Sequence, residues 1–256
     1  LMSRTSPGRY AIHEFAKNVS DIEIDDGAGA ALSYQRPSPG QWDVAGHSGV
    51  VRVRYEVFGD QVDGTFLGID TTHAHINIPA TLMWARGFEG RPVRVTFDAA
   101  PDWKVATQLK PTNDSRTFTA PNLQYLIDSP TELSNFTLRT FRVDQEFRIA
   151  LHHKGTDAEA DRFAAAVERI VREERAIFGE LPAFEAPYTF IADFLPHASS
   201  DGMEHRNSTI LTGAASLNDP GQQLDMLSTA AHEFFHSWNV ERIRPRSLEP
   251  FRLDAP

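Results

Sequence analysis

Val50-Val51-Arg52-Val53-Arg54-Tyr55-Glu56-Val57 alternates apolar with charged residues. Because successive side chains of a strand point to opposite faces, this alternation predicts a β-strand with one buried face. Similar short runs recur through the first part of the chain, separated by turn-forming Gly, Pro, Asp and Asn. They lie at Val93–Phe97, Trp103–Ala106, Thr117–Ala120, Phe136–Val143 and Glu146–Leu151. The pattern predicts that residues 1–150 form an N-terminal β-sandwich domain.

The hydrophobic period changes after Gly155. Thr156 and Glu159 have the spacing of a capping box, in which each side chain satisfies a backbone N–H of the other residue. Apolar residues then recur with a period close to 3.6 and predict a helix over Asp157–Phe178.

Further along, strand and helix patterns alternate. Strands are predicted at Tyr188–Phe194 and Ser208–Leu211. A second helix is predicted from a cap at Asp219 to about Val240. Residues 151–256 are therefore predicted to form a second domain that mixes helix and strand.

The overall composition excludes several classes of protein. Hydrophobic residues make up 41% of the chain and charged residues 23%, which is typical of a globular protein. The net charge of −10 argues against a nucleic-acid partner. The chain has no cysteine, which excludes disulfides and thiolate chemistry, and no apolar run of about 18 residues that would predict a membrane span.

The second predicted helix carries the segment His232-Glu233-Phe234-Phe235-His236. Two histidines four residues apart leave the same helix face, so both imidazoles can bind one zinc ion. Glu233 lies beside the metal and can act as the general base on zinc-bound water. This short pattern also arises by chance on surface helices, but here it lies on a capped and otherwise apolar helix, which favours a zinc site.

The segment Gly202-Met203-Glu204 lies between the two predicted strands. It is similar to a segment of zinc aminopeptidases in which an edge strand binds the peptide backbone and a glutamate binds the free α-ammonium group. We therefore expect Gly202 and Met203 to contact substrate and Glu204 to bind its amino terminus. The alternative interpretation of Glu204 is a solvated loop carboxylate.

Three segments together resemble the glycyl aminopeptidase family: Ser6–Val19, Gly202–Ser208 and the long motif His232–Pro245. This resemblance covers most of the chain. It implies a β-sandwich domain followed by a thermolysin-like catalytic domain. It also implies a zinc-dependent enzyme that removes N-terminal residues, often glycine or alanine, from peptides with a free amino terminus.

The chain departs from the family pattern at the third zinc ligand. Family members supply a glutamate from a later helix, in a Trp-x-x-Glu-Gly segment, and no such segment follows His236. The remaining carboxylate candidates are Glu249 and Asp254. The chain opens with Leu1-Met2, and the matching front segment starts partway into the family's sandwich, so we expect its first strands to be missing. We therefore expect a fragment that holds zinc weakly or not at all and is inactive alone.

Other polar residues have less specific patterns. His73 and His75 share one strand face, where hydrogen-bonded or solvent-facing histidines are expected more often than ligands. Asn239 and Arg242 follow the motif and are expected to support the ligands or Glu233 by hydrogen bonds. For Arg242 a buried or interdomain ion pair is an equal alternative. The oxyanion-stabilising group is left open, with two nearby histidines as candidates, His197 and His205.

Three functions are therefore compatible with the sequence: a zinc aminopeptidase, a zinc endopeptidase that does not need Glu204, and a peptide-binding module without catalysis. The cleavage preference, oligomeric state and compartment are left open. Family members often carry export signals, which favours the periplasm or the outside of the cell.

Overall fold

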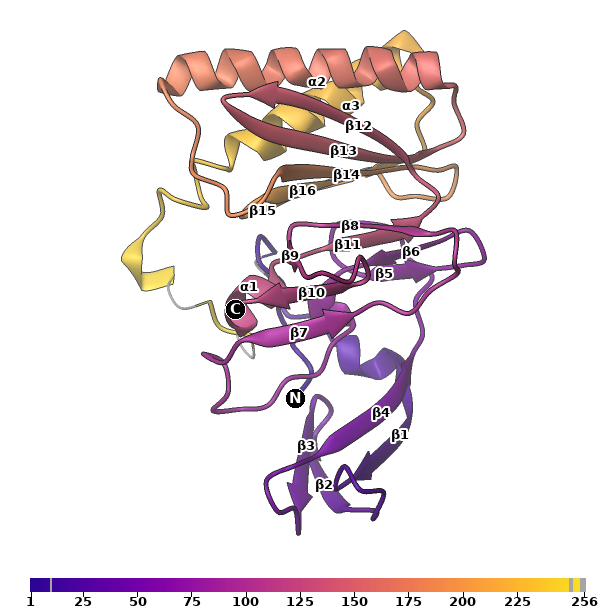
Figure 1. Cartoon of the computed structure of the whole chain (residues 1–256), viewed down its shortest axis with the longest axis vertical. Coiled ribbons are helices and arrows are strands. Elements are labelled where there is room, and N and C mark those ends of the chain that lie inside the picture. The colour runs from indigo at the N-terminus through magenta and orange to yellow at the C-terminus, as the bar shows by residue number, and fades with distance from the viewer. Residues whose placement is uncertain (10, 249–250, 254–256) are drawn as a thin grey trace.

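The computed structural model describes residues 1–9, 11–248 and 251–253. The molecule is layered (Figure 1): the small sheets of the first part lie on one side of a five-stranded sheet. The helices α2 (Asp157–Phe178) and α3 (Pro220–Phe235) cover the other side of that sheet.

The first part is built from antiparallel β-sheets, as its alternating strand patterns predicted. In the portion of the chain that the structure describes, these strands form four sheets, of two, two, three and four strands. Grouped by sheet, they are β1 (Val19–Asp25) and β4 (Arg52–Val57); β2 (Ser33–Ser38) and β3 (Gln41–Ala45); β7 (Val93–Thr96), β10 (Thr117–Ala120) and β9 (Lys110–Pro111); and β5 (Leu67–Ile69), β6 (His73–Ile76), β11 (Thr131–Ser134) and β8 (Lys104–Thr107). Its short helical turns are η1 (Phe15–Asn18), η2 (Ile78–Ala80) and α1 (Leu123–Ile127).

The four-stranded sheet of the first part lies next to the second part (Figure 1). Every residue of β6 and β11 is buried, including His73, His75 and Glu132. Polar groups enclosed in this way need partners, because water cannot reach them.

The second part has one five-stranded mixed sheet in the order β12-β13-β14-β16-β15. The strand β14 runs parallel to both of its neighbours, and β15 is the edge strand, antiparallel to β16. The strands are β12 (Thr137–Val143), β13 (Gln145–His153), β14 (Tyr188–Phe194), β15 (Asp201–His205) and β16 (Ser208–Gly213).

The hairpin of β12 and β13 belongs to this second sheet, although it lies before the boundary expected near residue 150. The change of sheet therefore falls between β11 and β12, near Phe136. The reason is that the change from strand to helix period marks the first helix of the second part and not its first strand. A strand pattern does not tell which sheet the strand joins.

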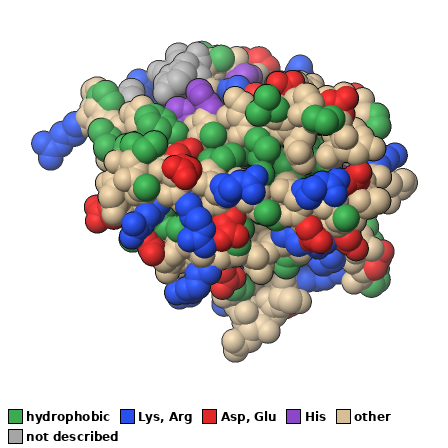
Figure 2. All heavy atoms as spheres, turned by 90° about the horizontal axis from the view of Figure 1, so that it is seen from above, with side chains coloured by type: hydrophobic (Ala, Val, Ile, Leu, Met, Phe, Trp, Pro, Cys, Tyr) green, Lys and Arg blue, Asp and Glu red, His purple; other side chains and the backbone are tan. Residues whose placement is uncertain are grey.

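Both long helices have the caps that their sequences predicted. In α2, Thr156 accepts a hydrogen bond from the Glu159 N–H while the Glu159 side chain accepts one from the Thr156 N–H. In α3, Asp219 accepts from the first free backbone N–H groups, and Pro220 occupies the first turn. Viewed from above (Figure 2), the outer surface of this layer mixes positive and negative side chains.

The helix α3 ends at Phe235, earlier than the predicted end near Val240. After His236 the chain continues in turns, in which the N–H of Glu241 donates to the His236 carbonyl at 3.1 Å. The Arg242 guanidinium donates to the Ser237 carbonyl at 2.8 Å. The carbonyls of the last helical residues are satisfied by tighter turns, in which the N–H of Ser237 donates to Phe234 at 2.9 Å and that of Trp238 to Phe235 at 3.1 Å, so the α-helical ladder stops there.

The main core lies between the five-stranded sheet and its two helices, and aromatic side chains dominate it. Phe147, Tyr188, Phe190 and Phe234 are all fully buried there and contact one another through edge and tilted ring packing. Phe234 thus anchors the motif helix to the sheet. No helix within the described ranges is long and apolar enough to cross a membrane.

Candidate active site

The two motif histidines project from the C-terminal end of α3. Their Nε2 atoms lie 3.2 Å apart. The Nδ1 atom of His236 donates to the Asn239 carbonyl oxygen at 2.6 Å, so its Nε2 carries the free lone pair. Two ligands held about 2.0 Å from one tetrahedral ion are separated by about 3.3 Å. His232 and His236 therefore fit a shared zinc ion, and the Asn239 backbone fixes the ring of one of them.

Glu233 lies on the side of α3 that faces the edge strand β15, with only 7% of its surface exposed. A Cβ atom on Gly202 would stand 2.4 Å from the Glu233 Oε1 atom and 2.7 Å from the Thr229 Cγ2 atom. Glycine at this position is therefore what leaves room for the Glu233 carboxylate. Burial, together with the nearby Glu204 and Asp201 carboxylates, raises the pKa of Glu233 to about 8.

The strand β15 carries the predicted substrate-binding segment. Gly202 pairs with Leu211 of β16, and Glu204 pairs with Thr209 of the same strand. The other edge of β15 is not paired in the described sheet. Met203 is buried, and Glu204 is partly buried. An edge strand of this kind offers backbone groups to an extended peptide.

The first part of the chain also reaches this site. The Arg9 guanidinium pairs with the Asp201 carboxylate, and its Nε atom donates to the Thr65 hydroxyl at 2.7 Å. The Gly64 N–H donates to the same Asp201 oxygen at 2.9 Å. Sequence reasoning missed Arg9 and Asp201. The resemblance included the segment of Arg9 but began just after Asp201, and no spacing rule linked residues that lie so far apart.

These groups surround one cavity of about 420 Å³. A carboxylate oxygen of Glu204, one of Glu233 and a ring nitrogen of His236 lie within 4.8 Å of one another. The structure thus brings together the predicted metal, base and substrate-binding residues. The lining residues are Gly8, Arg9, Gly202, Met203, Glu204, His232, Glu233, His236, Asn239 and Val240.

Arg242 supports this site indirectly. Its guanidinium donates to the carbonyl oxygens of Ser237 at 2.8 Å, Ala183 at 3.0 Å and Arg206 at 3.2 Å. It therefore ties the turns after α3 to the loop between β15 and β16, and the hydrogen bonds found for it among the described residues do not reach the histidines or Glu233. The ligand candidates Glu249 and Asp254 lie outside the described residues.

The two histidines considered for oxyanion stabilisation do not line the cavity. His205 is buried, and its Nδ1 atom lies 2.8 Å from an Asp128 carboxylate oxygen. Burial lowers the pKa of His205 to about 4 and raises that of Asp128 to about 8, so the two form a neutral hydrogen-bonded pair. His197 is exposed and lies near His73, on the other side of the sheet region.

Comparisons with known proteins agree with this organisation. The model of the Peptidase M61 N-terminal domain matches residues 1–135, and that of the M61 glycyl aminopeptidase matches residues 225–256. The chain is also similar to the crystal structure of an aminopeptidase N family protein from Idiomarina loihiensis, with a TM-score of 0.86 and 25% sequence identity. No curated protein matches the chain.

The similarity to that crystal structure covers 98% of this chain but 45% of the other chain. The chain therefore spans less than half the length of this relative. Together, the matches confirm the predicted order, in which an N-terminal β domain precedes the first part of a peptidase domain.

Proposed function

The chain belongs to the M61 glycyl aminopeptidase family, and we propose that it supplies the substrate-binding strand and the zinc-site helix for removing N-terminal residues from peptides. The cavity carries this proposal, because it places Glu204 of the edge strand opposite His232 and Glu233 of α3. A peptide lying along β15 would have its first residues at the motif helix.

We place the peptide backbone along the outer edge of β15, as a further strand of the sheet. Glu204 binds the α-ammonium group of the substrate, because a carboxylate forms a charge-assisted hydrogen bond with it. The cavity of about 420 Å³ is at the small end of the range for ligand sites, which suits a short side chain such as that of glycine or alanine.

His232 and His236 hold the zinc ion, and the family pattern adds a glutamate from a later helix as the third ligand. Zinc, when bound, supplies the Lewis acidity that makes water a nucleophile at neutral pH. The contact between His236 and the Asn239 carbonyl keeps that imidazole in the tautomer that a metal ligand needs.

Glu233 is the general base. Its carboxylate faces the cavity beside the strand that holds the substrate. The positive charge of a bound zinc ion would favour the ionised form of this carboxylate, which can then take the proton from the attacking water and pass it to the leaving amine. Gly202 leaves room for this carboxylate beside the strand that would bind the peptide.

The test uses an extended protein, in which these residues are followed by a carboxyl-terminal part equivalent to that of the Idiomarina loihiensis relative. We expect Glu233→Gln to keep zinc and to lower kcat by about 10²–10⁴, because the amide cannot accept the proton. The control is Asp225→Asn on the exposed start of the same helix, which should keep full activity. Retention of more than about a tenth of the activity in Glu233→Gln would exclude Glu233 as the base.

The same protein separates the other functions. A peptide with a free amino terminus and its acetylated form should be cleaved at very different rates by an aminopeptidase. Equal rates would indicate an endopeptidase, and zinc-free binding without cleavage would indicate a peptide-binding module.

A further inference from the structure

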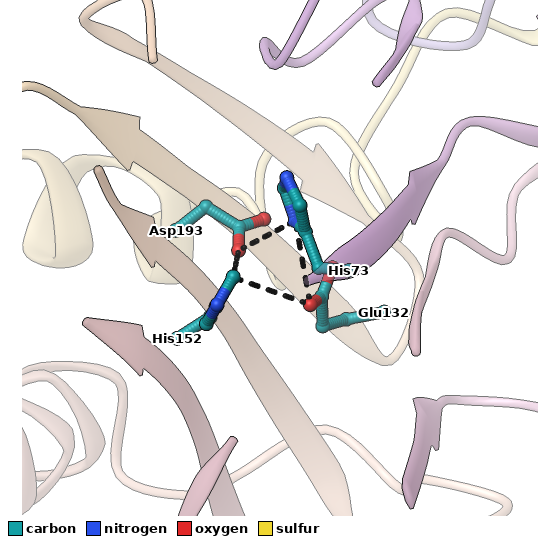
Figure 3. A group of neighbouring side chains, drawn as sticks. All are labelled: His73, Glu132, His152 and Asp193. Carbon is teal, nitrogen blue, oxygen red and sulfur yellow. Dashed lines mark ion pairs between the residues drawn. The ribbon is translucent and has the colours of Figure 1, made fainter. Parts of the chain in front are cut away.

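A second group of metal-ligand side chains lies where the two parts of the chain meet, away from the candidate active site. Glu132 and Asp193 are fully buried, His73 is 1% exposed and His152 is mostly buried. Their side chains point toward one another from four different strands (Figure 3). One polar atom of each lies within 4.8 Å of the others.

The strand register explains why these four residues converge. His73 and His75 lie two residues apart on β6 and so share one face, and Glu132 on β11 pairs with His75. In the other part, His152 on β13 pairs directly with Asp193 on the parallel strand β14. The two sheets face each other here, so each contributes one histidine and one carboxylate.

The four converging atoms are spaced like the ligands of one ion. The His73 Nδ1 atom lies 3.6 Å from the Glu132 Oε1 atom and 3.7 Å from the Asp193 Oδ1 atom. The His152 Nδ1 atom lies 3.7 Å and 3.3 Å from the same two oxygens. The edge of a tetrahedron is about 1.63 times its centre-to-corner distance, so zinc ligands at about 2.0–2.2 Å are separated by about 3.3–3.6 Å.

These four atoms share a further property, which is that none has a hydrogen-bond partner among the described residues. Within the described part of the chain, His73 Nδ1, Glu132 Oε1, His152 Nδ1 and Asp193 Oδ1 are buried and make no hydrogen bonds. The second Glu132 oxygen is also buried and makes none there. Carboxylate oxygens enclosed without a partner are costly, which indicates that something else binds them.

A neighbouring pair shows what a simple ion pair looks like at this place. The His75 Nδ1 atom lies 2.6 Å from the Asp193 Oδ2 atom, and its Nε2 atom lies 2.9 Å from the Asp63 carbonyl oxygen. His75 is therefore fully hydrogen-bonded, as expected for a structural histidine. The four converging atoms are separated by longer distances than this pair. Direct hydrogen bonds between them would shorten these distances to about 2.7–3.2 Å.

We propose that His73, Glu132, His152 and Asp193 form a structural zinc site that joins the two parts of the chain. Two imidazoles and two carboxylates give four zinc ligands with no open position, and closed four-coordinate geometry is typical of structural zinc. Of the two buried carboxylates, Asp193 also pairs with His75, and the positive charge of the ion would offset the negative charge that remains on Glu132 and Asp193.

The surroundings also suit a metal site. His75 holds the second oxygen of Asp193, and the Asp70 carboxylate lies 3.8 Å from the Nε2 atom of His73. Such outer contacts orient ligands. Asp70 and His197 are exposed and lie within reach of His73, so the proposed site is close to the surface on that side.

The test measures zinc in a His232→Ala/His236→Ala variant of the chain, which removes the helix pair and leaves the second group intact. After loading with zinc and gel filtration, mass spectrometry should find about one zinc per chain. Adding Glu132→Gln should lower the zinc content at least about tenfold, because a ligand is lost. The matched control is His153→Ala, which changes the next residue of β13 and should keep the ion.

A second measurement does not depend on how the Glu132 variant folds. Cobalt titrated into the His232→Ala/His236→Ala variant should give the intense visible bands of tetrahedral coordination at one equivalent. Zinc should raise its Tm by about 5–10 °C, and a chelator should reverse this. The proposal would be overturned if the His232→Ala/His236→Ala variant retained no zinc and gave no cobalt bands. It would also be overturned if the variant with Glu132→Gln added were folded and kept the ion.

Discussion

At Gly202 the lack of a side chain determines where the candidate base can lie. A Cβ atom there would stand 2.8 Å from the Glu233 Cδ atom as well as 2.4 Å from its Oε1 atom. The end of a glutamate can move aside, but Thr229 is a stiff β-branched neighbour on the same helix. An added methyl group is thus expected to displace the Glu233 carboxylate and, through Thr229, to move β15 slightly away from α3.

Gly202→Ala tests this point in the extended protein. We expect kcat/KM to fall on the order of 10- to 100-fold, because misplacing a catalytic group by about 1 Å has this effect. The contact with Thr229 should also lower the free energy of unfolding by about 1–3 kcal/mol. Steady-state kinetics and thermal unfolding measure the two quantities. Gly213→Ala is the control, since its Cβ atom would meet only the flexible end of Met226 at 3.3 Å. An unchanged kcat/KM in Gly202→Ala would show that the Glu233 carboxylate keeps its catalytic position when residue 202 carries a methyl group.

Single residues also show where sequence reasoning stops. The spacing of His232 and His236 predicted their common helix face, because one helical turn fixes it. The spacing of His73 and His75 predicted a common strand face in the same way, but not what that face meets. Glu132 and Asp193 reach it only through the pairing of two sheets, and no local pattern encodes that packing.

At the scale of elements, α2 carries an unfavourable carboxylate. Glu174 is half-buried, and one of its oxygens is enclosed without a hydrogen bond among the described residues. Burial raises the pKa of Glu174 to about 8. The folded chain therefore keeps a proton that the unfolded chain loses above about pH 4.5, and stability falls as the pH rises toward 8.

Glu174→Gln should remove this dependence. At pH 8 we expect the variant to be more stable than the parent by roughly 1 kcal/mol, less than the full shift implies because water screens a half-buried carboxylate. Near pH 5 the two proteins should be equally stable. Urea unfolding at both pH values measures the difference, with the exposed neighbour Glu173→Gln as control. An equal gap at both pH values would contradict this account.

The elements themselves were largely predictable, for a physical reason. The range of α2 follows from its capping box and its apolar period, and β14 follows from a short buried run. The end of α3 was not predictable from the motif, because the chain after Phe235 leaves the helix in tight turns and Arg242 ties these turns to distant loops. The hairpin of β12 and β13 was predicted as strands but joined a different sheet than expected.

At the scale of the whole molecule, a buried amide joins the two parts. Gln108, between β8 and β9, has no exposed surface. Its Nε2 atom donates to the Asp128 carbonyl oxygen at 2.6 Å and the Ser129 hydroxyl at 3.1 Å. Its Oε1 atom accepts from the Asn207 N–H at 2.9 Å and the Ser208 hydroxyl at 2.8 Å, both in the second part.

Gln108→Leu keeps the volume of this side chain and removes all four hydrogen bonds. The Asn207 N–H and the Asp128 carbonyl would then stay buried without this partner, so we expect the free energy of unfolding to fall by about 2–4 kcal/mol. Urea unfolding of the chain measures it. Gln124→Leu, on the exposed side of α1, is the control and should change stability by less than about 0.5 kcal/mol. A similarly small change in Gln108→Leu would mean that water or a shifted backbone replaces the amide, and that the two parts are held together mainly elsewhere.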